Sequence, residues 1–147
     1  MMLVTLERTA ERSRDAVLLL SRILLAPIFV SSGFGKLIHF GGFAASIAEK
    51  GLPWPLLWTV AAVAAEFLGG LCVLLGLWPR AAAPVMFLFT GFAAVLGHPF
   101  WLADAAHYQF QFINFMKNVA IMGGFLALFI AGPGSISIDG WLSRRRR

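Results

Sequence analysis

Glu66 is the only charged residue in an apolar run from Leu56 to Leu77. This run has the length that a helix needs to cross the hydrocarbon core of a bilayer, about 20 residues. A carboxylate near the middle of such a helix costs about 2.5 kcal/mol or more unless it is paired, protonated or hydrated. Ionisable groups kept at that cost usually serve a function, so Glu66 is a candidate catalytic residue that carries a proton.

Arg22 is the second candidate catalytic residue and lies in another apolar segment, 16–37. The helical rise places Arg22 about 8–9 Å in from one end of that segment, and its depth then differs from that of Glu66 by less than about 10 Å. A long arginine side chain can cover this difference, so we expect an Arg22–Glu66 ion pair. The alternative is a structural pair that only sets the register of two helices.

Three further basic residues, Lys36, His98 and Lys117, fall at the opposite ends of their apolar segments. We expect them to form a ligand-binding cluster suited to an anion, an oxygen-rich ring or a carboxylate. The alternatives are that the lysines reach out to the interface and that His98 only ends a helix near the lipid headgroups.

Four apolar segments would position these residues, and they are 16–37, 56–77, 81–98 and 115–131. Lipid offers no partner for free backbone groups, so each segment must be helical. Small residues share the faces of the polar residues, as Gly33, Gly69 and Gly124 do, and they allow close helix packing. The link from Gly76 to Arg80 is short and requires antiparallel neighbours. The sequence therefore predicts an all-α, membrane-embedded, antiparallel four-helix bundle.

The composition excludes several classes of protein. The 147 residues are 59% hydrophobic and 13% charged, whereas soluble domains are about 45–50% apolar and about 25% charged. The net charge is +5, but the bases flank the apolar segments and form no solvated groove. We therefore expect membrane lipid as a partner and no nucleic acid.

The basic residues also predict the topology. Eight arginines (Arg8, Arg12, Arg14, Arg80 and the run 144–147) fall on one side of the membrane, against Lys36, Lys50 and Lys117 on the other. The positive-inside rule then places both termini in the cytoplasm. We expect an N-terminal cytoplasmic segment 1–15, a four-span domain 16–137 and a basic cytoplasmic tail 138–147. The first span is too long for the core of a signal peptide and is interpreted as an uncleaved anchor.

The two longer loops face outward in this topology. Residues 43–50 resemble a short surface helix that ends at Gly51. Residues 99–115 are rich in aromatic side chains, which is typical of an interfacial belt or a partly re-entrant segment.

Known cofactor motifs are missing from the sequence. The single cysteine, Cys72, excludes a dithiol relay within this chain. We do not expect haem, because the three histidines lie away from mid-membrane depth, and no residue pattern has the ligand spacing of a metal site.

Several short sequence elements follow one another between Leu18 and Asp139. They are Arg22 with Phe29-x-x-x-Gly33-x-x-Lys36, Gly51-Leu-Pro53, Glu66-x-x-Gly69-Gly70, Gly76-x-x-x-Arg80, His98, Lys117, and Gly132-Pro-Gly134 followed by Ser-Ile-Ser-Ile-Asp139. Together they resemble the DoxX family of small bacterial membrane proteins. The resemblance implies a multi-pass four-helix protein of the bacterial cytoplasmic (inner) membrane. Some members are linked to quinone-dependent sulfur oxidation, and others to oxidative-stress complexes.

Three functions stay open at this point. The first is a quinone-linked redox protein, or a subunit of a redox complex whose partner protein supplies the electron carrier. The second is a non-enzymatic scaffold or assembly factor for a redox partner, and the third is a small proton-coupled transporter. The sequence does not decide whether the protein is an enzyme or whether it forms a homo-oligomer.

Overall fold

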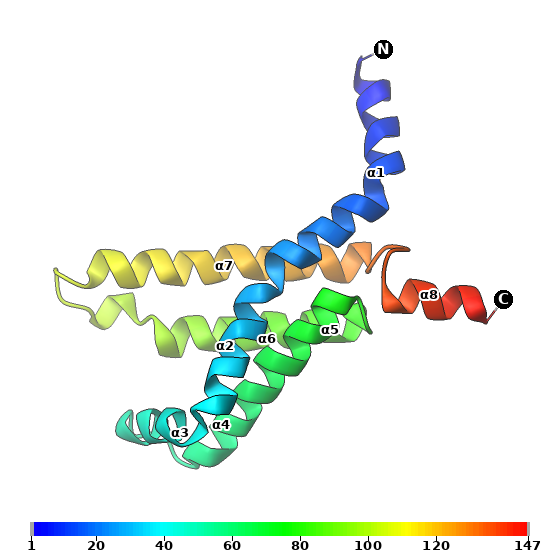
Figure 1. The fold of residues 1–147 in the computed structure, drawn as a ribbon. Helices are drawn as coiled ribbons and strands as arrows, with labels where there is room; N and C mark the ends of the chain where they lie inside the picture. The colour runs from blue at the N-terminus through cyan, green and yellow to red at the C-terminus, as the bar shows by residue number, and fades with distance from the viewer. Residues whose placement is uncertain (1, 147) are drawn as a thin grey trace.

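The computed structural model describes residues 2–146, with side chains from residue 7 onward, and every regular element in this range is a helix (Figure 1). In chain order these are α1 (Met2–Leu25), α2 (Pro27–Ile38), α3 (Phe40–Glu49), α4 (Pro55–Val63), the π-helix η1 (Ala64–Gly69), α5 (Gly70–Leu75), α6 (Pro79–Gly97), the 3-10 helix η2 (Phe100–Leu102), α7 (Tyr108–Ala131) and α8 (Ile138–Arg145).

Four helical stretches are long and apolar enough to cross a membrane, which confirms the predicted all-helical, four-span fold. They are Glu7–Ile38, Pro55–Leu75, Pro79–Leu102 and Tyr108–Ala131. The last begins at Tyr108 and not near residue 115, because the aromatic segment before residue 115 continues α7 and packs on α6 and η2. The loop between the third and fourth spans is correspondingly shorter than expected.

The first hairpin consists of α1–α2 and α4–η1–α5. Pro27 interrupts the first span, because proline lacks the N–H that would continue the helix, and the chain bends there. Gly33 brings α2 against η1: a Cβ atom at this position would lie 2.4 Å from the backbone nitrogen of Phe67. The close approach of these two backbones places α2 directly beside Glu66.

The second hairpin consists of α6 and α7, which pack along each other. It is joined to the first by the turn at Gly76, where the backbone is left-handed with φ 64°. The predicted neighbours α5 and α6 do contact each other next to this turn, and then they diverge (Figure 1).

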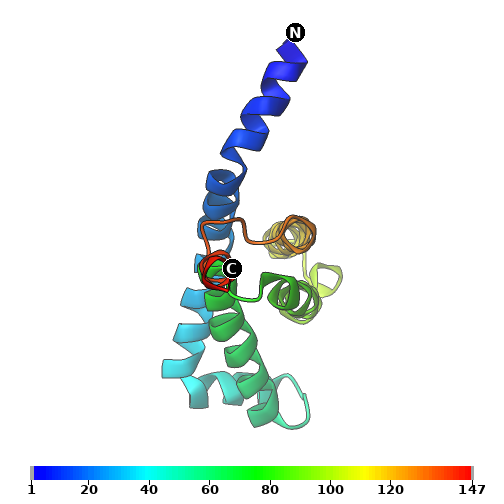
Figure 2. The same ribbon diagram turned by 90° about the vertical axis from the view of Figure 1, so that its right-hand side faces the viewer.

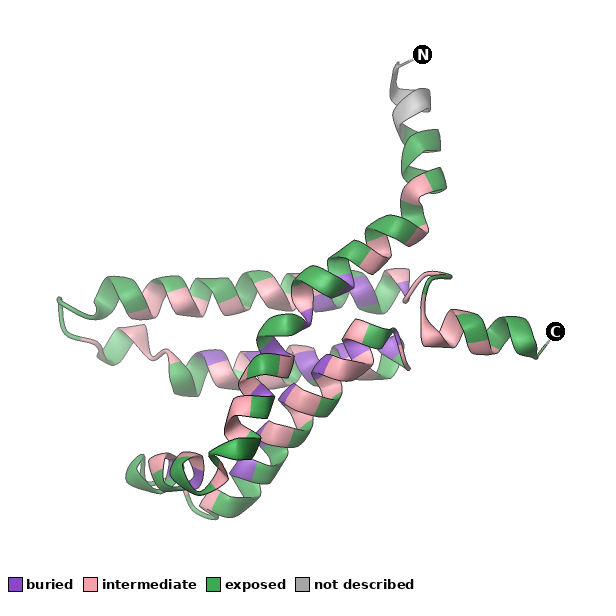
Figure 3. Cartoon of the chain, in the orientation of Figure 1, coloured by how far each residue is buried: buried purple, intermediate pink, exposed green. Residues whose placement is uncertain are grey.

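The two hairpins cross and are not aligned side by side, in contrast to the predicted bundle. In Figure 2, α6 and α7 are seen end-on while the first hairpin runs across the view. The hairpins meet where small residues leave room for large ones, as Gly69 does for Met86 and Gly124 for Leu25. The buried core lies at this crossing (Figure 3) and consists of Ala26, Phe29, Val73, Ala83, Met86, Phe125 and Leu128.

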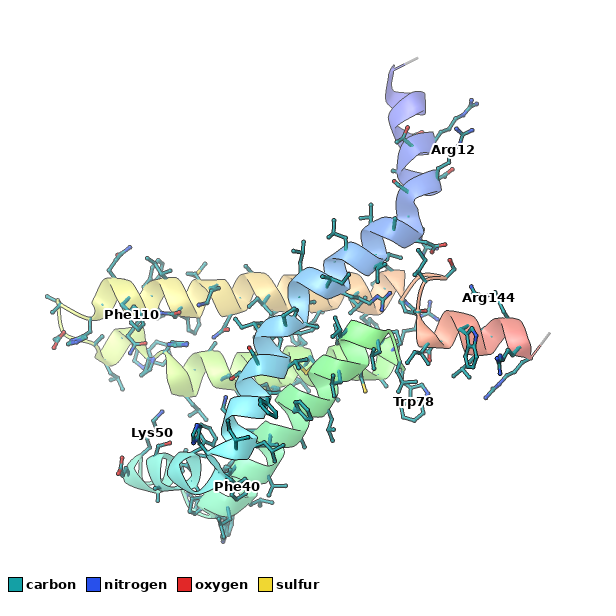
Figure 4. All side chains as sticks on the ribbon, viewed as in Figure 1. Arg12, Phe40, Lys50, Trp78, Phe110 and Arg144 are labelled. Carbon is teal, nitrogen blue, oxygen red and sulfur yellow. The ribbon has the colours of Figure 1, made fainter. Side chains whose placement is uncertain are left out.

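The ends of the molecule carry the remaining elements. The predicted surface helix is confirmed as α3, and Gly51 follows it with φ 73°. In the loop before α7, hydrogen bonds from the side chain and the backbone N–H of His107 lower the pKa of Asp104. Figure 4 shows Lys50 and Phe110 at one end, and Trp78 and Arg144 at the other.

Candidate functional site

Glu66 lies in the π-helical turn η1 and is 7% exposed. A π-helical turn contains an additional residue, which changes the direction of the side chains after it, and such turns are frequent at functional sites. Glu66 is therefore both buried in a span and placed on an irregular segment of helix.

Lys36 is the partner of Glu66. Its Nζ atom lies 2.6 Å from Glu66 Oε2 and donates a second hydrogen bond of 2.6 Å to Ser32 Oγ. The ammonium also lies 5.1 Å from the centre of the Phe43 ring, within the range of a cation–π contact. Lys36 follows Gly33 by about one helical turn, so the close approach of α2 to η1 positions the pair.

A cavity of about 420 Å³ adjoins this pair, between the first hairpin and α6–α7. Its size is within the range of small-molecule sites, about 300–1,000 Å³. The polar residues that line it are Ser32, Lys36, Ser46, Lys50, Glu66, Thr90, His98 and Asn118. The rest of the wall is apolar, so the cavity offers a few polar groups in apolar surroundings.

Some of the polar groups remain available to a ligand. The side chains of Lys50 and Asn118 form no hydrogen bond with any described residue. His98 Nδ1 lies 3.0 Å from Gln111 Oε1, which leaves the other ring nitrogen unused. The hydroxyl groups of Ser46 and Thr90, in contrast, donate to backbone carbonyls. The site can therefore donate hydrogen bonds to ligand oxygen atoms and accept a proton at Glu66.

Residues 17–99 match the model of the DoxX family. Two inner membrane proteins of Escherichia coli K12 are similar over most of their length: YphA is 38% identical over 127 residues, which cover 86% of this chain and 91% of YphA. YqjF is 34% identical over 135 residues, which cover 92% of this chain and 98% of YqjF. The chain belongs to the DoxX family. No solved structure matches it.

This DoxX-family protein is an inner-membrane protein, as the sequence predicts. Its relatives YphA and YqjF are both inner membrane proteins. Four spans in this chain are consistent with that location.

The predicted Arg22–Glu66 ion pair is wrong for this DoxX-family chain. Arg22 is 1% exposed and donates to the backbone carbonyls of Leu74, at 2.9 Å, and Ile136. The depth estimate assumed aligned, straight helices, whereas the first span bends at Pro27 and brings Lys36 to Glu66. Arg22 instead joins the end of α5 to the segment before α8.

The predicted basic cluster is brought together only in part. Lys36 and His98 both line the cavity of the DoxX-family protein, whereas Lys117 does not. Lys117 is exposed on α7 and donates to Asn114 Oδ1 at 2.8 Å. The crossing of the hairpins turns the adjacent residue Asn118 toward the cavity in its place.

Sequence reasoning missed Ser32, Lys50 and Asn118 as polar residues of the site. Ser32 had a recognisable signal, because it precedes Lys36 by four residues and so lies on the same helix face. Asn118 had none, since its position depends on how the hairpins cross. Within the described part of this DoxX-family chain, no three His, Cys, Asp or Glu side chains are grouped as metal ligands.

Proposed function

We propose that this protein binds a quinone in the cavity beside Lys36 and Glu66, and that it works as a quinone-linked redox protein or as a subunit of a redox complex. One observation carries the proposal: an ion pair between the buried Glu66 and the partly buried Lys36 borders a ligand-sized cavity inside the membrane-spanning region. An ionisable pair within a membrane span supports the hypothesis of a functional site.

The groups along the cavity fit a quinone ring. Ser32, Lys36 and Asn118 can donate hydrogen bonds to carbonyl oxygens, while Phe29 and Ile121 supply apolar wall. A bound quinone would supply the chemistry of electron and proton uptake at its carbonyl oxygens. Glu66 can hold a proton beside that ring, and Lys36 stabilises the carboxylate when the proton leaves.

The electrons have to come from elsewhere. The chain has a single cysteine, so it cannot cycle between a dithiol and a disulfide on its own. A partner protein in the same membrane would supply the electron carrier, which agrees with the role of a subunit.

The test measures the effect of a quinone on the melting temperature of the purified protein in lipid nanodiscs. At a ligand concentration of 100 times Kd, binding adds about 2.7 kcal/mol to the stability. We expect the double variant Lys36→Met/Glu66→Gln to stay folded and to lose this effect. The double substitution removes both charges together and leaves no lone buried charge.

Glu49→Gln is the matched control, because Glu49 is an exposed carboxylate on α3 that does not line the cavity. It should retain the full quinone effect. Absence of any quinone effect on the unmodified protein would refute the proposal.

A scaffold is the second candidate function. It is favoured by the aromatic cluster around Phe100, whose ring contacts those of Trp101, Tyr108, Phe112 and Phe115 at one end of the molecule. In that case the Lys36–Glu66 pair only joins α2 to η1. The double variant would then lower the melting temperature, and the quinone would have no effect on either protein.

A further inference from the structure

The cavity has an open side between α4 and α6. Seven of the residues that line the cavity are exposed, and five of them lie on α4 and α6 and mark its mouth: Trp58 and Ala61 on α4, and Phe92, Leu96 and Gly97 on α6. The other two are Ile28 on α2 and Lys50, which follows α3. Phe92 is 64% exposed and Leu96 is 47% exposed. The mouth therefore opens on the side surface of two membrane-spanning helices.

The opening follows from the way the hairpins cross. They are in contact through η1, α5 and α6 near the core, and α4 and α6 diverge away from it (Figure 1). Ala61 is the seventh residue of α4, which places it about 9 Å along the helix from its first residue. When Pro55–Leu75 spans the bilayer, a mouth at that distance from the start of the span lies at the depth of the acyl chains.

The chemistry of the cavity changes from its mouth to its inner end. The mouth is walled by aromatic and aliphatic side chains, whereas Lys36 donates hydrogen bonds to Ser32 and Glu66 inside. A ligand that matches both regions has an oxygen-bearing head and an apolar tail.

We infer that the ligand enters sideways from the lipid, between α4 and α6, and that it carries a hydrocarbon tail that lies between Ala61 and Leu96 while its head reaches Lys36 and Glu66. The identity of the head group as a quinone rests on the proposed function. The entry path and the hydrocarbon tail are inferred from the mouth alone. A lipid with another oxygen-bearing head would therefore use the same opening.

The experiment narrows the mouth and compares two ligands with the same head. Leu96→Trp places a bulky ring in the mouth, and Val95→Trp is its matched control, because Val95 is 49% exposed and does not line the cavity. Binding of a decyl-tailed quinone and of the tail-less quinone is measured in nanodiscs by the change in melting temperature with ligand concentration. Concentrations are expressed per lipid, which corrects for partition into the bilayer.

We expect Leu96→Trp to weaken binding of the tailed quinone about tenfold, and that of the tail-less quinone by less than about twofold. Val95→Trp should change neither value. Ala61→Trp, with Val60→Trp as its control, tests the opposite wall and serves in case Leu96→Trp does not fold. Equal losses for both ligands, or no loss for the tailed one, would overturn the inference while leaving quinone binding intact.

A decyl-tailed phenol separates the inference from the proposed function. If no quinone binds but the phenol binds and loses affinity in Leu96→Trp alone, the quinone function fails and the path holds. If neither kind of tailed compound binds the unmodified protein, both are refuted.

Discussion

Arg22 and Lys36 lie on one face of the first span, but Arg22 binds backbone carbonyls and Lys36 binds a carboxylate. Arg22 donates to carbonyl oxygens beside the end of α5, where the helix dipole is negative, and it is sealed from solvent. Lys36 holds a carboxylate and borders a cavity. The Arg22 guanidinium therefore joins parts of the fold, whereas the Lys36 ammonium borders the cavity that we propose as the ligand site.

Replacement of Arg22 tests this difference. Arg22→Met removes the donor to two backbone carbonyls, those of Leu74 and Ile136, and should lower the free energy of unfolding by about 2–4 kcal/mol. Arg22→Lys should recover only part of the loss, because a lysine cannot reproduce the planar set of donors. Thermal unfolding in a mild detergent measures both. Unchanged stability in Arg22→Met would contradict the structural role.

At the scale of elements, the contact of α2 with η1 positions the Lys36–Glu66 pair. Its closeness depends on Gly33, because any Cβ atom there would overlap the backbone of Phe67. The pair also depends on the π-helical turn η1, because this turn sets the direction of the Glu66 side chain within a span that is otherwise α-helical. The site is thus produced by a close packing of two helices and by one irregular turn.

Gly33→Ala should separate α2 from η1 and lower the free energy of unfolding by about 1–3 kcal/mol, the usual cost of overpacking. Gly35→Ala is the control on the same helix, because a Cβ atom there has no neighbour within 4 Å. Melting temperatures of the two variants in nanodiscs make the comparison. Equal melting temperatures would show that α2 and η1 are not in close contact.

At the scale of the whole molecule, the two hairpins cross, so α4 and α6 diverge (Figures 1 and 2), and residues of both helices line the cavity. The segment before α8 holds the opposite end together, where Asp15 accepts hydrogen bonds from the backbone and the hydroxyl of Ser135. The cavity is therefore open at the side where the hairpins diverge and closed where they meet.

The sequence predicts the helices and the importance of Glu66, because the cost of a charge in lipid depends only on residue type and on the length of the apolar run. It does not predict the partner of Glu66. Lys36 reaches it through the bend at Pro27 and the contact at Gly33, both of which depend on tertiary packing. Asn118 was missed for the same reason. Whether Lys117 or its neighbour Asn118 faces the cavity depends on how the hairpins cross, and the sequence does not show this.

The central claim is that a quinone lies in the cavity beside Lys36 and Glu66. Labelling with a photoreactive azido-quinone in nanodiscs, followed by peptide mass spectrometry, tests it most directly. The account predicts labels on residues that line the cavity, such as Ser32, Ala61 and Asn118, and their loss in Lys36→Met/Glu66→Gln. Labels confined to the face of α7 that carries Lys117, or an unchanged pattern in the double variant, would contradict it.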